Sequence, residues 1–255
     1  MSFQTIRYEV ADRVAVISYD RQERRNAWSL PMYRETVQAI EAANADEGVG
    51  AIVITHEGPT FCAGTDFKAA PEPPDPATGR SPNVASVSMA QDSSWLHLLA
   101  RSKPTIGAIR GAAIGLGVTQ ILPFDMRVGG EGSTYAFPFL RLSVMPELGC
   151  TALLPRLVGY GRAVHICLTA ATLDAREAER IGLITAVYPD DQVLPQAIAL
   201  AGRIASYPAL QTNLTRDLLR DNAGEHDINA LLRRESAAFI AMFRARRKET
   251  TVKEG

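Results

Sequence analysis

Residues 14–55 read VAVISYDRQERRNAWSLPMYRETVQAIEAANADEGVGAIVIT, and this stretch predicts the layout of the N-terminal half. The runs Val14–Ser18 and Ala51–Thr55 are rich in β-branched residues and bounded by charge or glycine, which is typical of buried strands. Between them, apolar residues recur at helical spacing over Pro31–Asn44, and a first helical turn accepts the proline. Strand, helix and strand in this order predict an α/β layered domain.

The rest of the chain continues this pattern and then becomes helical. A further strand, Thr105–Ile109, leads into the glycine-punctuated segment Gly111–Gly117 and an apolar helical segment. Asp174 has the spacing of a helix N-cap, with Glu177 three residues later. From Asp190 onward the pattern is helical almost to the end, with breaks near Pro208 and Gly224. We therefore expect one α/β core over residues 1–195 and a C-terminal helical region over residues 196–255.

The segment from Ala69 to Asn83 is proline-rich and carries few apolar groups. Proline removes a backbone donor and fixes φ, so no regular element is expected there. We interpret the segment as a mobile loop.

Composition excludes several classes of protein. The 255 residues carry 27 basic and 28 acidic side chains, a formal charge of -1, so no global field favours nucleic acid or a membrane surface. The cysteines Cys62, Cys150 and Cys167 lie far apart and form no CxxC pair, and the histidines are dispersed. These patterns predict no disulfide framework and no metal site, and they favour a cytoplasmic protein.

Two glycine turns could carry chemistry. Phe61–Phe67 (FCAGTDF) follows a predicted strand, and Gly64 permits a backbone conformation that other residues resist. Gly115–Gly117 opens a helix, where the first amides have no partner within the helix. Two such amides could share one oxyanion. Taken alone, each turn is more often a packing solution than a catalytic feature, and neither matches a dinucleotide or phosphate-binding loop.

In combination, the order of these features resembles the enoyl-CoA hydratase/isomerase (crotonase) superfamily over roughly residues 5 to 220. The segments that match the family's motifs are Arg24–Ala27 (RRNA), Phe61–Phe67, Lys103–Gly117, Pro155–Gly159 (PRLVG) and Ala178–Val187. The resemblance implies a spiral of repeated β-β-α turns and a homotrimer, or a dimer of trimers, with the C-terminal helices in trimerisation. It also implies an acyl-CoA thioester substrate that carries its own coenzyme A, and no separate cofactor. The wall of the acyl pocket is expected between Pro71 and Leu99, the part of the chain that sequence patterns describe least.

The same resemblance assigns expected roles to individual residues. The amides of Ala63 and Leu116 become the oxyanion donors that stabilise a thioester enolate. Arg24 and Arg25 would lie near the phosphates or adenosine of coenzyme A, although paired surface arginines are usually solvated charge. The remaining residues expected to line the substrate are Ala27, Gly64, Thr65, Asp66, Phe67, Phe137 and Phe139. Two of these also have ordinary structural readings, since Asp66 could order its own turn and aromatics such as Phe137 are more often core.

The general base is where this chain departs from the hydratase pattern. A hydratase of the family uses two glutamates, and the corresponding positions here are Thr119 and Phe139. Neither side chain can act as a carboxylate base. Glu147, in the sequence VMPELGC, resembles the single catalytic acid of some enoyl-CoA isomerases, and desolvation by Phe137, Phe139 and Met145 would raise its pKa. Alternatively, Glu147 caps the helix that begins near Gly149.

These observations favour an enoyl-CoA isomerase and leave two other functions open. One is a hydratase, or a hydrolase or lyase of a specialised acyl-CoA, in which Glu147 acts through an ordered water. The other is a catalytically silent acyl-CoA-binding subunit, since Thr119 and Phe139 replace the two glutamates. A nucleotide-binding oxidoreductase is disfavoured because no dinucleotide fingerprint follows any predicted strand.

Overall fold

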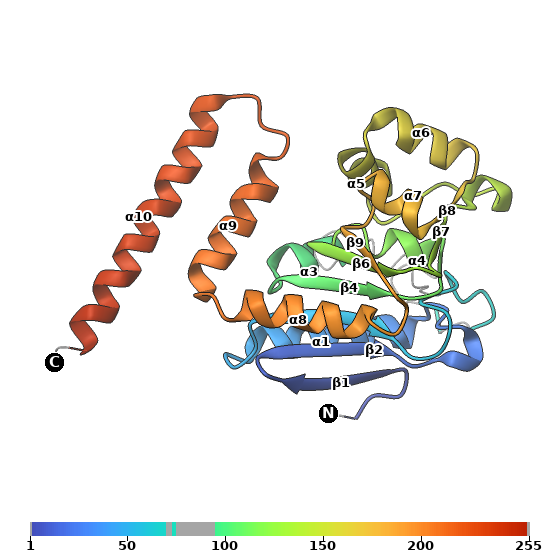
Figure 1. Cartoon of the computed structure of the whole chain (residues 1–255), viewed down its shortest axis with the longest axis horizontal. Helices are drawn as coiled ribbons and strands as arrows, with labels where there is room; N and C mark the ends of the chain where they lie inside the picture. Colours follow the sequence, from blue (N-terminus) through green and yellow to red (C-terminus); the bar gives the residue numbers. More distant parts are fainter. Residues whose placement is uncertain (1, 70–72, 75–94, 254–255) are drawn as a thin grey trace. The chain divides into compact units, whose positions relative to one another are not determined.

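The computed structural model describes residues 2–69, 73–74 and 95–253 (Figure 1). The chain separates into two compact units, residues 1–202 and 203–255. The segment predicted as a mobile loop, Ala69 to Asn83, lies outside the described residues except for positions 69, 73 and 74. Much of the expected acyl-pocket wall between Pro71 and Leu99 also lies outside them.

The first unit is built on a mixed six-stranded sheet with the order β1-β2-β3-β4-β6-β9. Its strands are β1 (Ile6–Ala11), β2 (Val14–Tyr19), β3 (Ala51–His56), β4 (Thr105–Ile109), β6 (Met126–Gly130) and β9 (Ala186–Tyr188). The β1–β2 pair is antiparallel and the other pairs are parallel. Every residue of β3 is buried, as expected for a parallel strand covered on both faces. The three strands predicted from sequence are confirmed.

A second, three-stranded sheet has the order β5-β7-β8, with β5 (Ala112–Ile114), β7 (Thr134–Ala136) and β8 (Thr172–Asp174). The chain passes repeatedly from the first sheet to the second and then into a helix. It does so from β4 through β5 into α4 (Leu116–Thr119), and from β6 through β7 towards η2 (Phe139–Leu142) and α5 (Cys150–Val158). An isolated bridge between Cys62 and Ala113 extends the second sheet after β3. This alternation is the expected series of β-β-α turns.

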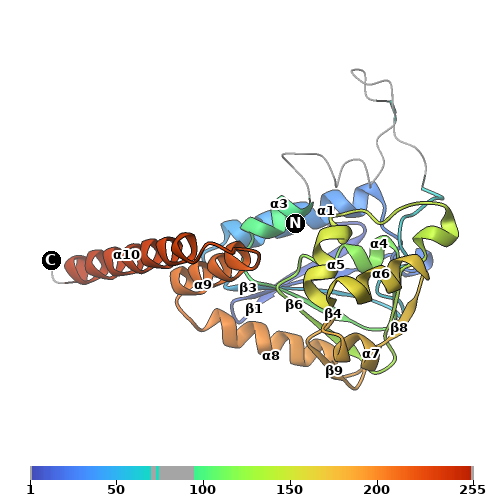
Figure 2. The ribbon, with the colours of Figure 1, turned by 90° about the horizontal axis from the view of Figure 1, so that it is seen from above.

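Helices cover both faces of the six-stranded sheet. Figure 2 shows α1 (Leu30–Ala45) and α3 (Trp95–Arg101) on one face and α8 (Val193–Ala205) on the other. The hydroxyl of Ser29 accepts the amide of Met32 at the start of α1, and a proline occupies the first turn. The helix predicted over Pro31–Asn44 is therefore confirmed, with its boundaries displaced by one residue at each end.

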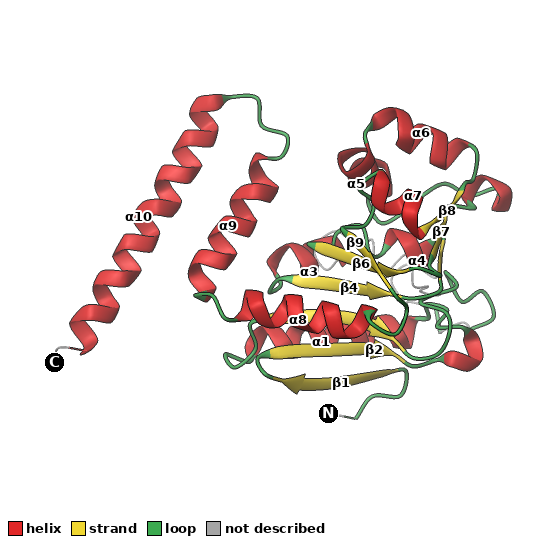
Figure 3. Cartoon of the chain, in the orientation of Figure 1, coloured by secondary structure: helices red, strands yellow, loops and turns green. Residues whose placement is uncertain are grey.

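The remaining helices of the first unit follow the second sheet (Figure 3). They are α6 (Tyr160–Leu168) and α7 (Ala175–Arg180), which lie on either side of β8 in the sequence. The predicted N-cap is confirmed, because the carboxylate of Asp174 accepts the amide of Glu177 at 2.8 Å. The reciprocal half of a capping box is not formed, since the Glu177 carboxylate pairs with Arg180 instead.

Aromatic side chains fill the centre of the first unit. Trp28 packs edge-to-face against both Tyr19 and Trp95, with ring centroids 5.4 and 5.3 Å apart. The Tyr19 hydroxyl donates to the Gln120 side chain, and the Trp95 indole donates to the Gln120 carbonyl. Burying Tyr19 and Trp95 is tolerable because their polar atoms are paired, whereas Trp28 Nε1 has no hydrogen-bond partner among the described residues. The core thereby ties β2 and the loop before α1 to α3 and to the segment after α4.

The second unit contains α9 (Ala209–Asn222) and α10 (Ile228–Lys253), and helix α8 leads into it. The helical breaks predicted near Pro208 and Gly224 are confirmed by the connections on either side of α9. Large apolar side chains are exposed along α10, namely Ile228, Leu232, Phe239, Ile240 and Phe243. Among the described residues, no helix combines the length and the apolar character needed to cross a membrane.

Candidate active site

The turn after β3 is held against the second sheet by two backbone hydrogen bonds. The Cys62 amide donates to the Ala112 carbonyl at 3.1 Å, and the Ile114 amide donates to the Cys62 carbonyl at 3.0 Å. Gly64 follows with φ +95°, and a Cβ placed on it would lie 2.8 Å from the Ile114 carbonyl oxygen. Only glycine therefore fits this close approach between the turn and β5 without strain.

The residue after Gly64 has a free amide. Thr65 forms a parallel bridge with Trp28, in which the Trp28 amide donates to the Gly64 carbonyl and the Asp66 amide donates to the Trp28 carbonyl. This pairing uses the groups on both sides of Thr65 and leaves its own N–H directed elsewhere. Within the described residues, the Thr65 amide has no acceptor.

Leu116 provides a second free amide close to the first. It is the first residue of α4, and its N–H also has no acceptor among the residues that the structure describes. The position of a Cβ on Gly64 would be 3.9 Å from the Leu116 nitrogen, so the peptide that joins Gly64 to Thr65 lies beside this amide. Thr65 and Leu116 thus form a pair of unsatisfied donors suited to one anionic oxygen.

Ala63, which the sequence predicted as a donor, does not belong to this pair. Its amide donates to the Arg25 carbonyl at 3.1 Å. The Arg25 carbonyl points to the Ala63 amide because Arg25 and Asn26 both adopt left-handed backbone conformations, each with φ 52°. An amide already bonded within the fold is not available to a substrate, so we correct the assignment from Ala63 to Thr65. The expectation for Leu116 is consistent with the structure.

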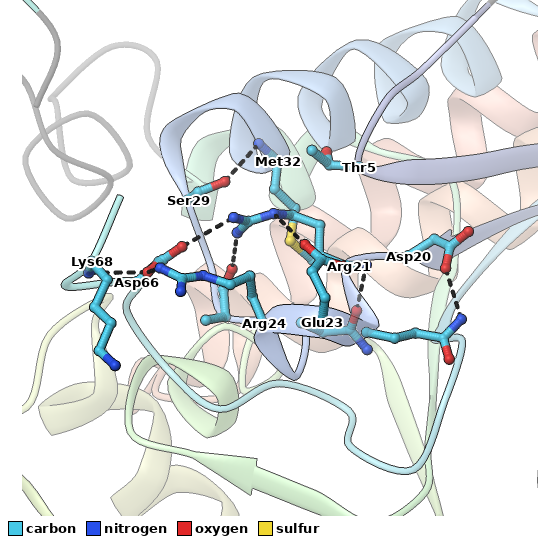
Figure 4. Close-up of polar contacts among 12 residues, drawn as sticks. Thr5, Asp20, Arg21, Glu23, Arg24, Ser29, Met32, Asp66 and Lys68 are labelled. Carbon is cyan, nitrogen blue, oxygen red and sulfur yellow. Dashed lines mark hydrogen bonds and ion pairs between the residues drawn. The ribbon is translucent and has the colours of Figure 1, made fainter. Parts of the chain in front are cut away.

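The carboxylate of Asp66 joins the turn after β3 to the loop between β2 and α1 (Figure 4). Its carboxylate accepts from Arg21 Nη2 and Arg24 Nη2, each at 3.1 Å, and from the Lys68 amide at 3.1 Å. Arg21 also donates through Nη1 to the Ala27 carbonyl at 2.7 Å. The prediction that Asp66 orders its own turn is confirmed by the Lys68 contact.

The environment of Asp66 stabilises its charged form. The side chain is only 4% exposed, and burial by itself opposes ionisation. Hydrogen bonds from Arg21, the Lys68 amide and Arg24 outweigh this effect and lower the pKa of the carboxyl below its usual value. Asp66 is therefore an ionised structural anchor beside Thr65 rather than a proton carrier.

The two arginines predicted to bind coenzyme A differ in their surroundings. Arg24 is partly buried and occupied by Asp66. Arg25 is exposed, and within the described residues its side chain makes no ion pair. Only Arg25 thus presents an uncommitted guanidinium. Ala27 is buried, with its carbonyl already bonded to Arg21.

The aromatic residues expected to line the substrate are placed unequally. Phe137 is fully buried and Phe139 is 3% exposed, and both belong to the hydrophobic core. Phe67, next to the oxyanion turn, is 81% exposed. Trp28 and Trp95 are core residues as well. Phe137 and Phe139 are therefore core residues in this structure, whereas Phe67 is accessible to a ligand.

Glu147 lies within hydrogen-bonding distance of α4. Its Oε1 accepts from the hydroxyl of Thr119, the last residue of that helix, at 3.1 Å. The alternative that Glu147 caps α5 is not supported, because Gly149 is the N-cap residue and no side chain caps this helix. Leu148 and Gly149 both have left-handed φ values, and only the Glu147 carbonyl is bonded to the start of α5.

Burial raises the pKa of the Glu147 carboxyl, and the hydrogen bond from Thr119 opposes the rise in part. A raised pKa brings a carboxyl closer to the range in which it can both accept and return a proton near neutrality. Met145 does not contribute to this burial as predicted, since its side chain is 75% exposed. Phe139, by contrast, is buried as expected.

Other reactive groups do not converge here. Burial raises the pKa of the Cys62 thiol to about 12, so this cysteine is an inert filler of the core. Among the described residues, no three His, Cys, Asp or Glu side chains are arranged to hold a metal ion. The described residues thus combine a carboxyl of raised pKa, bonded to the end of α4, with two amides that have no acceptor, one of them at the start of α4.

The family of the chain follows from comparison with known proteins. The family model described as enoyl-CoA hydratase/isomerase matches residues 9–255. The chain belongs to the enoyl-CoA hydratase/isomerase family. It is an acyl-CoA enzyme of that superfamily, and its fold is the family's α/β fold with helices at the C-terminus.

Relatives of this enoyl-CoA hydratase/isomerase family member are similar over most of their length. An enoyl-CoA hydratase from Alternaria alternata is 34% identical over 245 residues, which are 95% of this chain and 80% of the relative. A 4-chlorobenzoyl coenzyme A dehalogenase from an Arthrobacter species is 30% identical over 221 residues, covering 86% and 79%. A solved enoyl-CoA hydratase of Thermobifida fusca in complex with CoA has a TM-score of 0.82 and 30% identity, with 96% and 95% covered.

One prediction for this family member concerns the contact between α4 and the turn after β3. A Cβ on Gly117 would lie 2.3 Å from the Cys62 carbonyl oxygen, a backbone atom fixed by its bond to Ile114. We expect Gly117→Ala to destabilise the protein by about 1–3 kcal/mol or more through overpacking. Urea unfolding of the purified variant measures this change.

The matched control is Gly161→Ala. Gly161 is also a helical glycine, but a Cβ there meets no atom within 4 Å. Because alanine has the higher helix propensity, this substitution should be neutral or stabilising by up to about 1 kcal/mol. Equal destabilisation by the two substitutions would contradict the close approach of α4 to the turn.

Proposed function

We propose that this chain is an enoyl-CoA isomerase that shifts a carbon–carbon double bond, with Glu147 as the acid/base. The observation that carries the proposal is the pairing of Glu147 with Thr119. It brings one carboxylate to the helix whose first residue has a free amide. Neither glutamate of a two-glutamate hydratase has a counterpart at its own position, because Thr119 and the buried Phe139 occupy those two positions.

The distances along α4 suit a single site. Leu116 and Thr119 are three residues apart, which corresponds to about 4.5 Å along a helix axis. Thr119, which donates to the Glu147 carboxylate, therefore lies about one helical turn from Leu116. A substrate held along α4 would have the base at one end of the helix and the amide of Leu116 at the other.

The proposed reaction has two proton transfers. The Glu147 carboxylate removes a proton from C2 of a 3-enoyl-CoA, and the electron pair of that bond moves into a dienolate with negative charge on the thioester oxygen. The amides of Thr65 and Leu116 stabilise this oxygen. The protonated Glu147 then returns the proton to C4, and the double bond forms between C2 and C3. No atom is gained or lost.

We further propose that coenzyme A enters as part of the substrate and that no separate cofactor is required. A solved relative of 30% identity is described as a complex with CoA. The exposed guanidinium of Arg25 suits a phosphate of coenzyme A, since Arg24 is occupied by Asp66. The exposed ring of Phe67 is placed to contact the acyl group.

We infer a homotrimer or a dimer of trimers, in the cytoplasm. In the first unit, apolar side chains are exposed on and around η2 and α6, namely Leu140, Leu142, Val144, Met145, Tyr160 and Leu168. An exposed apolar surface of this kind is typical of a subunit interface. All three cysteines are free, which suits a reducing compartment. Sedimentation velocity of the purified protein tests the assembly, and a monomer would contradict it.

A hydratase is the second candidate, because the enoyl-CoA relatives are named as hydratases. Incubation with panels of 3-enoyl-CoA and 2-enoyl-CoA in deuterated water, followed by mass spectrometry, separates the two functions. The isomerase predicts interconversion with deuterium uptake and no addition of water. Addition of one water to the 2-enoyl-CoA would establish the hydratase. Binding of the thioesters without any exchange would instead indicate a silent acyl-CoA-binding subunit.

A further inference from the structure

Thr119 occupies the position of a hydratase glutamate but contacts the proposed base of this chain. Its side chain is fully buried, and its Oγ1 lies 3.1 Å from Glu147 Oε1. The same oxygen lies 3.4 Å from the Leu116 carbonyl. A hydroxyl has one proton to donate, and a carboxylate at the shorter distance is the stronger acceptor. The hydroxyl proton of Thr119 therefore points to Glu147.

The two oxygens of the Glu147 carboxylate differ in their surroundings. Oε1 accepts the Thr119 hydroxyl, whereas Oε2 accepts no hydrogen bond from the part of the chain that the structure describes. The amide of Cys150, the nearest backbone donor in the following helix, is bonded to the Glu147 carbonyl and not to the carboxylate. Within the described residues, Oε2 therefore keeps both of its acceptor sites for a substrate proton, whereas the Thr119 hydroxyl occupies one of the two on Oε1.

We propose that Thr119 is a positioning residue, whose hydroxyl holds Oε1 of Glu147 so that Oε2 alone removes and returns the substrate proton. This inference rests on the proposed function of Glu147 as the acid/base. When the C2–H bond breaks, its proton forms the Oε2–H bond and its electron pair enters the dienolate. When the Oε2–H bond breaks, the proton goes to C4. The Thr119 hydroxyl keeps its proton and donates to Oε1 in both states.

This arrangement fixes the plane of the carboxyl group during both transfers. A freely rotating carboxylate would exchange its oxygens between the first and second transfer, and each reorientation would lower the fraction of productive complexes. Thr119 cannot rotate away easily, because it is fully buried and lies at the end of a short helix. The residue that replaces a carboxylate thus acquires a different task, which is to orient the carboxylate that remains.

Among the residues that the structure describes, few other titratable groups face Glu147. Helix α4 has the sequence LGVT and carries none, and Leu96 of α3 is the side chain that lies against Gly149. From α5, the Cys150 thiol interacts electrostatically with Glu147. The hydrogen bond between the two thiols raises the pKa of Cys150 and lowers that of Cys167. Because substitution at Thr119 leaves both thiols in place, their effect cancels between wild type and variant.

Two substitutions separate the hydroxyl of Thr119 from its volume. Thr119→Val keeps the shape and removes the hydroxyl, and Thr119→Ser keeps the hydroxyl and removes the methyl group. The pH dependence of kcat for 3-enoyl-CoA is measured for both. Without the hydroxyl the pKa of Glu147 rises further, so for Thr119→Val we expect the acidic limb to move up by about one pH unit.

We also expect Thr119→Val to lower kcat by about tenfold or more, because the base is misoriented. KM should change little, because the contacts with coenzyme A are unchanged. Thr119→Ser should restore the wild-type pH profile. A wild-type profile for Thr119→Val would overturn the proposal. A pH profile of Thr119→Ser that matches Thr119→Val instead of wild type would overturn the proposal too, since the methyl group and not the hydroxyl would then set the profile.

A readout that needs no turnover distinguishes this inference from the proposed function. The carboxyl group of Glu147 is titrated by NMR in protein labelled with ¹³C at the glutamate carboxyls, and its signal is identified by its absence in Glu147→Gln. An upward shift of the titration midpoint in Thr119→Val, and not in Thr119→Ser, supports the hydroxyl–carboxylate bond even if the substrate panel reveals another reaction. An unchanged midpoint overturns the bond even in an active isomerase.

Discussion

Glu147→Gln should lower kcat for isomerisation by about 10²–10⁴, because general acid–base catalysis supplies that factor and an amide can neither take nor return the proton. The amide oxygen can still accept the Thr119 hydroxyl that now reaches Oε1 at 3.1 Å, so the loop keeps its hydrogen bond. KM should change little, since coenzyme A contacts are untouched. Steady-state kinetics with 3-enoyl-CoA measures both constants.

The control for this loss is Glu131→Gln. Glu131 is exposed, and its carboxylate lies 3.5 Å from Arg176 in a surface ion pair. Such pairs contribute little, so kcat should remain at the wild-type level. Full activity of Glu147→Gln would remove Glu147 from the mechanism and favour an acid/base elsewhere in the chain.

The stability of Glu147→Gln gives a further expectation with a definite sign. Burial raises the pKa of Glu147 in the folded protein, so the folded state binds a proton more tightly than the unfolded state. Wild-type stability therefore falls as pH rises through the unfolded pKa of about 4.3 and on through the raised folded pKa. The glutamine variant has no such titration, so it does not lose this stability as pH rises. It should match or exceed wild-type thermal stability at neutral pH, and the difference should shrink in acid.

Leu116→Pro should lower kcat by about 10²–10³ relative to Leu116→Ala, because proline removes one oxyanion donor. Proline is tolerated at the first position of a helix, where the N–H has no partner within the helix. The preceding residue, Gly115, has φ 56° and ψ -117°, which is outside the helical region that a following proline disfavours. The comparison therefore measures the loss of the amide donor together with the entry of the proline Cδ in the place of its hydrogen.

Leu116→Ala is the matched control, because it also loses the buried leucine side chain but keeps its N–H. Both variants should be less stable than wild type, and thermal unfolding shows whether they remain folded at the assay temperature. Similar kcat values for the two folded variants would show that the Leu116 amide does not stabilise the transition state.

Much of the first unit follows from local sequence. The long β-branched runs at β2, β3 and β4 and the apolar periodicity of α1 indicate their structures without reference to the rest of the chain. The strands β5, β7, β8 and β9 have only three residues each, and β6 contains Arg127 and two glycines. Such segments become strands because their partners lie beside them, which no local pattern reveals.

In the candidate site, too, local sequence predicted some features and only the tertiary structure decided the others. Gly64 and Gly115 mark both turns in the sequence, and Leu116 follows from its place at the start of a helix. The choice between Ala63 and Thr65 could not be made in this way. It depends on the Arg25 carbonyl, which occupies the Ala63 amide, and on Trp28, which pairs around Thr65. These partners are more than 35 residues distant in the chain.

The sequence by itself determined the family motifs, the absence of carboxylates at positions 119 and 139, and Glu147 as the acid in the following loop. Only the tertiary structure decided which amides are free, that Asp66 is held by Arg21 and Arg24, and that the Thr119 hydroxyl is bonded to Glu147. The physical reason is the short range of a hydrogen bond. It forms only when donor and acceptor lie within about 3 Å, and folding sets that distance for residues far apart in the chain.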